Sequence, residues 1–220
     1  ISYAEQDPLE WWEAVKKSIQ KALQEAGLQG RDIAGIGFSG QMHGMVALDE
    51  NKQLACKAII HLDQRSSLEL KEIRTLAGNL MTEELLNQPS AGMMISSLYW
   101  LKKHQKETYD RIRYVMSPKD YISFRLCGEI GTEYTDAGAA LGFSVKNYRW
   151  CTELFKRLEL KEEIWPPVHK SFEIAGNVTA EAAEETGLST STKVIYGAGD
   201  SMAALTGNGI IESGFITCNI

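Results

Sequence analysis

Hydrophobic side chains recur at three- and four-residue steps in one long segment near the start of the chain. The segment covers residues 8–26, and its apolar positions are Trp12, Val15, Ile19, Ala22 and Leu23. Charged and amide residues fill the positions between them, which is the pattern of an amphipathic helix. Asp7 suits the N-cap of such a helix and Gly27 suits its end. We therefore predict a helix over residues 8–26.

Short apolar runs alternate with further helical patterns along the rest of the chain. The runs that predict strands are 33–38, 45–48, 58–60, 114–116 and 193–196, and the dipeptide 39–40 predicts a turn. The segments that predict helices are 66–77, 95–104, 119–126, 150–158, 179–186 and 201–205. Helices that interleave with short strands indicate the α/β class. The apolar run 215–220 predicts one more strand, and we expect the chain to be part of a longer protein.

Composition and charge narrow the classes of function. Of 220 residues, 44% are hydrophobic and 24% are charged, as in ordinary globular proteins. No apolar stretch approaches the roughly 20 residues of a membrane span, so we expect no membrane association. A net charge of −6 without a dense Lys/Arg run argues against a nucleic-acid partner. The four cysteines form no C-x-x-C pair, which favours a reducing compartment such as the cytoplasm over a disulfide framework.

The strongest local signal lies where the last predicted strand meets a helix. Gly197 and Gly199 allow a sharp turn and the close approach of a ligand, and Asp200 follows them directly. Ligands of α/β folds bind at the carboxyl ends of strands, where this carboxylate is expected. A helix N-cap explains Asp200 equally well. A dinucleotide loop fits poorly, because Met202 stands where that fingerprint has Gly or Ala.

A second group of polar side chains follows two earlier strands. Gln41, Met42 and His43 stand between glycines and would suit a small molecule rich in hydroxyl groups, although a hairpin with incidental polar residues is the simpler interpretation. Asp63 and Arg65 point to the same side of an extended chain, where they could bind a ligand or pair with each other. The segment 134–138 adds one more carboxylate, at position 136, which could also be a loop or capping residue.

Six short motifs follow one another along the chain. They are Glu5–Pro8 with Trp11–Trp12, Gly40–Gly44, His61–Arg65, Ser117–Tyr121, Tyr134–Gly138 and Gly197–Asp200. Taken in this order, they resemble the FGGY family of carbohydrate kinases, and its xylulose kinases most closely. Two positions depart from the family pattern. His61 stands where the family usually has Trp, and Ser201 where xylulose kinases often have Asn. Both changes would lie close to the substrate.

The resemblance implies a fold and a set of site residues. The fold would be ribonuclease-H-like, of the actin-like ATPase type, and incomplete at both ends. Residues 1–220 would form the N-terminal sugar-binding domain, without the family's first strands and its C-terminal ATP-binding domain. The implied catalytic base and magnesium ligand is Asp200. The implied sugar contacts are Gln41, Met42, His43, Asp63 and Arg65, with Gly197 and Gly199 on the side of the nucleotide cofactor.

The resemblance also implies an activity with ATP and Mg²⁺ as cofactors. We expect the transfer of phosphate to the terminal hydroxyl of D-xylulose, which gives D-xylulose 5-phosphate. Ribulose, gluconate and glycerol remain alternative acceptors, and a non-catalytic sugar-binding homologue is a second class of function. The 220 residues alone are not expected to turn over ATP, because the family binds the nucleotide on the other domain. The only partner implied is the small-molecule sugar, and the sequence leaves a monomer and a homodimer both open.

Overall fold

The first long helix, α1, spans Pro8–Ala26 and confirms the prediction from the hydrophobic pattern. The computed structural model describes residues 2–216. Asp7 accepts the backbone N–H of Leu9 at the start of α1, and Gly27 ends the helix in the left-handed region with φ 65°. Trp12 is buried and donates its indole N–H to Glu185 of α8 (Ala180–Thr186) at 2.8 Å. The amphipathic face of α1 therefore packs against another helix as well as against the sheet.

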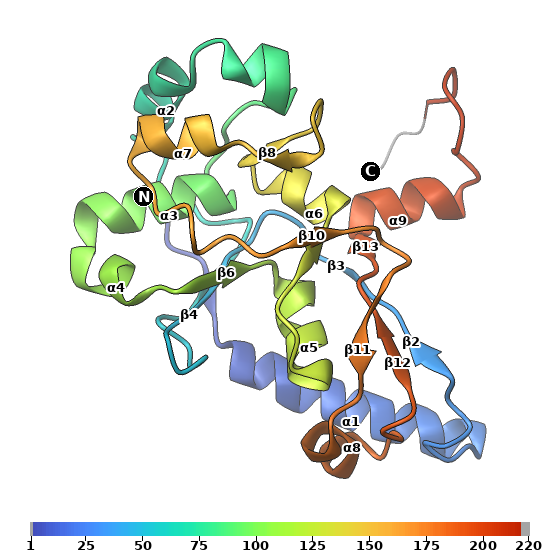
Figure 1. Ribbon diagram of the computed structural model, residues 1–220. Coiled ribbons are helices and arrows are strands. Elements are labelled where there is room, and N and C mark those ends of the chain that lie inside the picture. Colours follow the sequence, from blue (N-terminus) through green and yellow to red (C-terminus); the bar gives the residue numbers. More distant parts are fainter. Residues whose placement is uncertain (1, 217–220) are drawn as a thin grey trace.

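A small sheet lies over these helices (Figure 1). Its strands are β11 (Ile174–Asn177), β12 (Lys193–Ile195) and β2 (Gly35–Ile36). β12 is antiparallel to β11 and parallel to β2. The chain continues beyond β2 and β12 into a second parallel pair, β3 (Ser39–Gly40) and β13 (Ala198–Gly199). The core between this sheet and the helices α1, α5 (Pro118–Cys127) and α8 contains Trp12, Leu126, Val178, Ala182 and Val194.

The helices on the opposite side of the molecule surround a larger core (Figure 1). They are α2 (Leu70–Ala77), the short π-helix η1 (Met81–Leu85), α3 (Met94–His104), α4 (Lys106–Arg111) and α7 (Thr152–Leu158). Residues 94–101 of α3 are buried, and the rings of Phe155 and Trp165 stack at 4.5 Å in the same cluster. Two antiparallel pairs border this core, β4 (Val46–Leu48) with β6 (Tyr114–Met116) and β1 (Glu5–Gln6) with β5 (Ala58–Ile59).

Between the two cores lies the short helix α6 (Tyr134–Ala139), which follows directly on β7 (Thr132–Glu133). β7 pairs in parallel with β10 (Val168–His169), and a hairpin joins β8 (Phe143–Ser144) to β9 (Arg149–Trp150). The last helix described, α9 (Asp200–Gly207), follows β13 and buries none of its residues. No helix among residues 2–216 is both long enough and apolar enough to cross a membrane.

The structure confirms the α/β class and corrects several element boundaries. The run 33–38 forms only the short strand β2, and the turn predicted at 39–40 is wrong because these two residues pair with β13. Residues 66–69 form turns, so the helix predicted over 66–77 begins at Leu70. The strand predicted at 215–220 falls mostly on residues 217–220, which lie outside the described part of the chain. Within residues 2–216, seven further strands and three helical segments that the pattern did not predict have only two to six residues each.

Candidate functional site

The candidate site begins at the parallel pair of β3 and β13. Ala198 lies opposite Ser39 and Gly199 opposite Gly40, so both strands end at the same edge. The loop 41–43 follows one strand and Asp200 follows the other. A Cβ atom on Gly199 would lie only 2.6 Å from Cγ of Met42, so any larger residue there would displace the Met42 side chain. The structure thus brings Asp200 beside the loop 41–43, as the motifs predict.

Gly197 likewise allows two segments of the chain to approach closely, in this case its own segment and Phe38. Its φ of +75° lies in the left-handed region, and a side chain there would collide with the backbone of Phe38. Packing against the neighbouring strands is therefore sufficient to explain both Gly197 and Gly199. Their role in binding a nucleotide stays a prediction.

Asp200 is the first residue of α9, and its side chain is exposed. The helix N-cap is Gly199, and Asp200 does not take the capping position that the sequence left open. Its Oδ1 accepts the backbone N–H of Ser201 at 2.6 Å and lies 3.3 Å from the Ser201 hydroxyl. Within residues 2–216 no basic side chain pairs with this carboxylate, which leaves Oδ2 available to a ligand.

The loop 41–43 presents an amide, a thioether and an imidazole, all half-buried. His43 adopts a left-handed backbone conformation with φ 72°, and its Nδ1 lies 2.9 Å from the carbonyl oxygen of Ala139. Because a carbonyl only accepts hydrogen bonds, Nδ1 carries the proton and Nε2 of the neutral ring is an acceptor. The Gln41 side chain contacts His61 Nδ1 at 3.0 Å. His61, one of the two departures from the family pattern, therefore belongs to this site.

Asp63 and Arg65 are buried and bind each other. The Asp63 carboxylate accepts the backbone N–H and Nε of Arg65 through Oδ1, and Nη2 of Arg65 and the Ala4 N–H through Oδ2. Glu5 accepts a further hydrogen bond from Arg65 at 2.6 Å, and the guanidinium lies 4.3 Å from the ring centroid of Tyr3. This geometry favours mutual pairing, which fixes the end of the loop that carries His61. Direct contact of Asp63 and Arg65 with a sugar stays a prediction.

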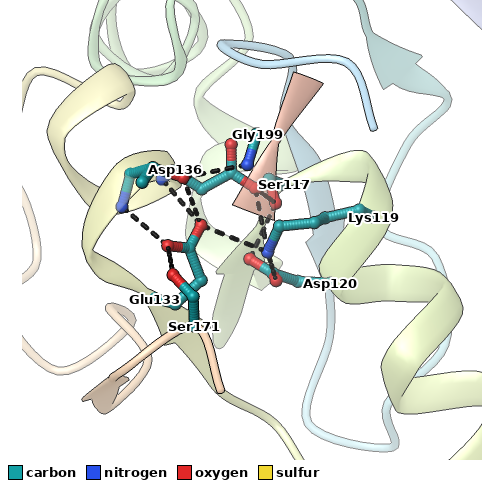
Figure 2. A network of polar contacts seen from close by, with 8 residues as sticks. Ser117, Lys119, Asp120, Glu133, Asp136, Ser171 and Gly199 are labelled. Carbon is teal, nitrogen blue, oxygen red and sulfur yellow. Dashed lines mark hydrogen bonds and ion pairs between the residues drawn. The ribbon is translucent and has the colours of Figure 1, made fainter. Parts of the chain in front are cut away.

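A buried cluster of four charged side chains lies next to this edge (Figure 2). Lys119 is 4% exposed and lies between three carboxylates, Asp120 at 2.6 Å, Asp136 at 3.1 Å and Glu133 at 3.5 Å. Burial opposes the charge of Lys119, but the three carboxylates more than offset this and raise its pKa. Asp120 lies in α5, Glu133 at the end of β7 and Asp136 in α6, so the cluster joins α5 to the β7–α6 segment.

Sequence reasoning found two motifs here but missed the cluster that they form. The motifs 117–121 and 134–138 supply Lys119, Asp120 and Asp136, whereas Glu133 lies just outside the second motif. Glu133 is the N-cap of α6, because its carboxylate accepts the backbone N–H groups of Thr135 and Asp136. An acidic residue directly before the first residue of a short helix was the one local signal for this role. Asp136 is thus neither a loop residue nor the cap.

The geometry of Ser117 indicates that one carboxyl group of the cluster holds a proton. The Ser117 Oγ lies 2.7 Å from Oδ2 of Asp120 and 2.7 Å from Oδ2 of Asp136. A hydroxyl donates only one hydrogen, so the second contact needs a proton on the carboxyl group. Oδ1 of Asp136 is buried without a partner, which costs less for a neutral acid than for a carboxylate. Burial, with the nearby charge of Asp120, outweighs Lys119 and Ser117 and raises the Asp136 pKa to about 7 from 3.8.

This proton predicts a pH dependence of stability. Between about pH 4 and pH 7, Asp136 holds a proton in the folded chain but has lost it in the unfolded chain. The contribution of Asp136 to the free energy of unfolding therefore falls as the pH rises through that window. Replacing Asp136 with Asn, which cannot ionise, should remove this fall. Thermal unfolding followed by circular dichroism from pH 5 to pH 8 should show the wild type losing stability relative to the Asp136→Asn variant. The exposed Asp110→Asn variant is the control, and parallel wild-type and Asp136→Asn curves would contradict the assignment.

Of two cavities in the described chain, one borders the candidate site and the other lies toward the C-terminal end of α5. One of about 440 Å³ lies between α1, β2, β3 and α5 and includes Gln41 and Lys119 in its lining. The other, of about 640 Å³, lies between the start of α1, the turn after β4, α5 and α8. Asp200 and His43 line neither of them. The face at the end of the parallel pair therefore borders the first cavity through Gln41.

The donor groups at this face are compatible with the cofactors that the motifs imply. No group of three or more His, Cys, Asp or Glu side chains within residues 2–216 could hold a metal ion by itself. Mg²⁺ is usually bound by one or two carboxylates together with phosphate oxygens and water. The single exposed carboxylate of Asp200 fits that pattern and does not fit a site built from protein ligands alone.

Known proteins share this architecture. A xylulose kinase of Staphylococcus epidermidis is 36% identical over 99% of this chain, which spans about 43% of that relative's length. Among solved structures, a xylulose kinase from Rhodospirillum rubrum superposes with a TM-score of 0.89 at 26% identity, over 96% of this chain and 44% of that one. A gluconate kinase from Lactobacillus acidophilus gives 0.83 at 26% identity, over 91% of this chain and 40% of that one. These neighbours confirm the ribonuclease-H-like, actin-type fold. The model for the N-terminal domain of the FGGY family of carbohydrate kinases matches residues 1–207, and the chain belongs to that family.

Proposed function

We propose that the protein carrying this chain uses ATP to phosphorylate the terminal hydroxyl of a ketopentose, and that the ketopentose is D-xylulose. One observation carries the proposal: the parallel pair of β3 and β13 places the exposed carboxylate of Asp200 beside the loop 41–43. The similarity to xylulose kinases supports the choice of sugar. Residues 1–220 would form the sugar-binding domain of this kinase.

In this proposal Asp200 is the general base. Its Oδ2, which no basic side chain occupies within the described residues, would accept the proton of the attacking sugar hydroxyl. Phosphoryl transfer depends mainly on position and charge stabilisation, so one well-placed carboxylate is the main chemical group that this domain needs to supply. Mg²⁺, when bound, neutralises charge on the phosphates of ATP, and Asp200 would be its ligand from this chain. Gly197 and Gly199 would face the nucleotide.

The loop 41–43 would bind the sugar. Nε2 of His43 is oriented by the Ala139 carbonyl and can accept a hydrogen bond from a sugar hydroxyl, while the Gln41 amide can donate and accept. Met42 would give an apolar surface next to Gly199. Asp63 and Arg65 would act on the sugar through the loop that carries His61, because their polar groups are already engaged with each other and with Glu5.

A panel of acceptors tests the proposal. ATP consumption by the kinase that carries this chain should be highest with D-xylulose and lower with ribulose, gluconate and glycerol. Gluconate is included because a gluconate kinase has the same fold at 26% identity. Activity with gluconate or glycerol above that with D-xylulose would contradict the choice of sugar. Sugar binding in calorimetry without ATP consumption on any acceptor would contradict the kinase and support a non-catalytic sugar-binding homologue.

His61 gives a sharper test of the sugar-binding loop. Its ring contacts the Gln41 side chain at 3.0 Å, so we expect it to orient the amide toward the sugar. The His61→Phe variant keeps a ring of similar size and removes the hydrogen bond, and it should raise the KM for the sugar roughly 3- to 10-fold with kcat little changed. The His104→Gln variant is the control, because His104 binds Glu69 at the end of α3. A KM within two-fold of wild type would show that His61 does not orient Gln41.

A further inference from the structure

A hydroxyl group from a separate element holds the backbone immediately before Asp200. Oγ1 of Thr135, in the first turn of α6, accepts the backbone N–H of Gly199 at 2.9 Å across 64 residues of sequence. Gly199 is also the residue of β13 that lies opposite Gly40 of β3. Its position is therefore fixed from two directions, by the neighbouring strand and by this hydroxyl.

The direction of the Thr135 hydroxyl is fixed as well. Its single proton goes to Oε1 of Glu133 at 2.7 Å, which leaves an oxygen lone pair for the Gly199 N–H. Glu133 in turn accepts the Thr135 N–H at 2.8 Å and the Ser171 hydroxyl at 3.0 Å. The acceptor that holds Gly199 is thus part of a chain of hydrogen bonds in which each group has a defined role.

The same network reaches the strand that carries the sugar-binding loop. Glu133 is fully buried, and Lys119 lies 3.5 Å from its carboxylate. The stem of Lys119 packs on Gly40, where a Cβ atom would lie 2.9 Å from Cβ of Lys119. Figure 2 shows Lys119 on one side of the cluster and Glu133 on the other, with Gly199 at its edge. One buried network therefore contacts both strands that end at the candidate site.

We infer that Thr135 is a positioning residue for phosphoryl transfer: its hydroxyl, oriented by Glu133, fixes the Gly199 backbone and thereby the direction of the Asp200 carboxylate. The inference rests on the proposed function, because it assigns the effect to the step in which Asp200 takes the proton. Thr135 itself would touch neither sugar nor nucleotide. Its contribution should therefore be found in kcat and not in sugar affinity.

Paired substitutions at Thr135 test the inference in the kinase that carries this chain. The Thr135→Val variant keeps the shape of the side chain and loses the acceptor, and we expect kcat to fall roughly 10- to 100-fold, as for a misplaced catalytic group. The KM for the sugar should stay within about 3-fold of wild type. The Thr135→Ser variant keeps the hydroxyl and should restore most of kcat.

A control substitution at a comparable threonine distinguishes an effect on the position of Asp200 from a general loss of stability. Thr179 is half-buried like Thr135, and its Oγ1 also accepts a single backbone N–H, that of Ala182 at the start of α8. The Thr179→Val variant should lower the Tm as the Thr135→Val variant does, with kcat unchanged. Equal losses of kcat in both valine variants would overturn the positioning role, because general destabilisation would then explain them.

Amide hydrogen exchange distinguishes failure of this inference from failure of the proposed function. The Gly199 N–H should exchange faster in the Thr135→Val variant than in wild type or the Thr135→Ser variant, with or without catalysis. An active wild type whose Thr135→Val variant keeps its kcat overturns the inference and leaves the kinase standing. A wild type that phosphorylates no acceptor overturns the proposed function and the catalytic role of Thr135 together. Unchanged exchange at Gly199 overturns the inference in either case.

Discussion

Replacement of Asp200 with Asn should lower kcat of the kinase by about 10²- to 10⁴-fold, the usual contribution of a positioned general base. Asn has nearly the same shape as Asp but cannot take a proton from the sugar hydroxyl. The side chain is exposed at the first residue of α9 and forms no ion pair within residues 2–216, so the substitution should leave the fold unchanged. The affinity for the sugar, measured by calorimetry without ATP, should stay within a few-fold of wild type.

The control for this experiment is a second carboxylate at the start of a helix. Asp7 caps α1, and Asn is an equally good N-cap, so the Asp7→Asn variant should keep both stability and kcat. A loss confined to the Asp200→Asn variant supports the general base. If that variant keeps kcat within a few-fold of wild type, the assignment of Asp200 is wrong, whatever the sugar affinity.

Removal of the charge on Lys119 should cause the largest loss of stability among single substitutions of this network. The Lys119→Met variant would leave Asp120, Glu133 and Asp136 buried without a cation. Breaking a buried ion pair from one side costs about 3–5 kcal/mol, a large part of the 5–15 kcal/mol that typically stabilises a folded domain. We expect the Tm, followed by circular dichroism, to fall by roughly 6–20 °C.

Two controls test the origin of the loss of stability in the Lys119→Met variant: substitution of an exposed lysine, and a change of pH. Lys106 pairs with Asp110 on the surface, with 76% of its side chain exposed, so the Lys106→Met variant should lose less than about 1 kcal/mol. The deficit of the Lys119→Met variant should shrink between pH 8 and pH 5, as protonation removes negative charge from its carboxylates. A deficit that is independent of pH would point to lost packing rather than to unpaired charge.

The sequence predicts the long helices of this fold well, because their hydrophobic positions recur with the helical period over several turns. The helix over 8–26 has its bounds fixed locally by Asp7 and Gly27, and the structure confirms both ends. The pair of β3 and β13 could not be predicted in this way. Each strand has two residues, and its backbone hydrogen bonds depend on a partner more than 150 residues away in the sequence.

The candidate site likewise contains residues that the local sequence predicts and residues that only tertiary contacts reveal. Asp200 and the loop 41–43 follow strands, and residues that follow strands can be recognised from the sequence. The pairing of Asp63 with Arg65 was one of two alternatives, and only their burial among Ala4, Glu5 and Tyr3 favours it. The network of Lys119 and Glu133 was missed because charged residues normally lie at the surface. Nothing local marks those that tertiary contacts bury.

Helix α9 has one further consequence for the stability of this 220-residue chain. Within residues 2–216 none of the α9 residues is buried, so the position of the helix there depends on the chain from β13 and on the fixed Gly199 backbone. The large core around α3 contains no residue of α9. We expect local unfolding of α9 to displace Asp200 in the isolated chain while the rest of that chain stays native. Local unfolding of α9 and global unfolding of the isolated chain would then have separate free energies.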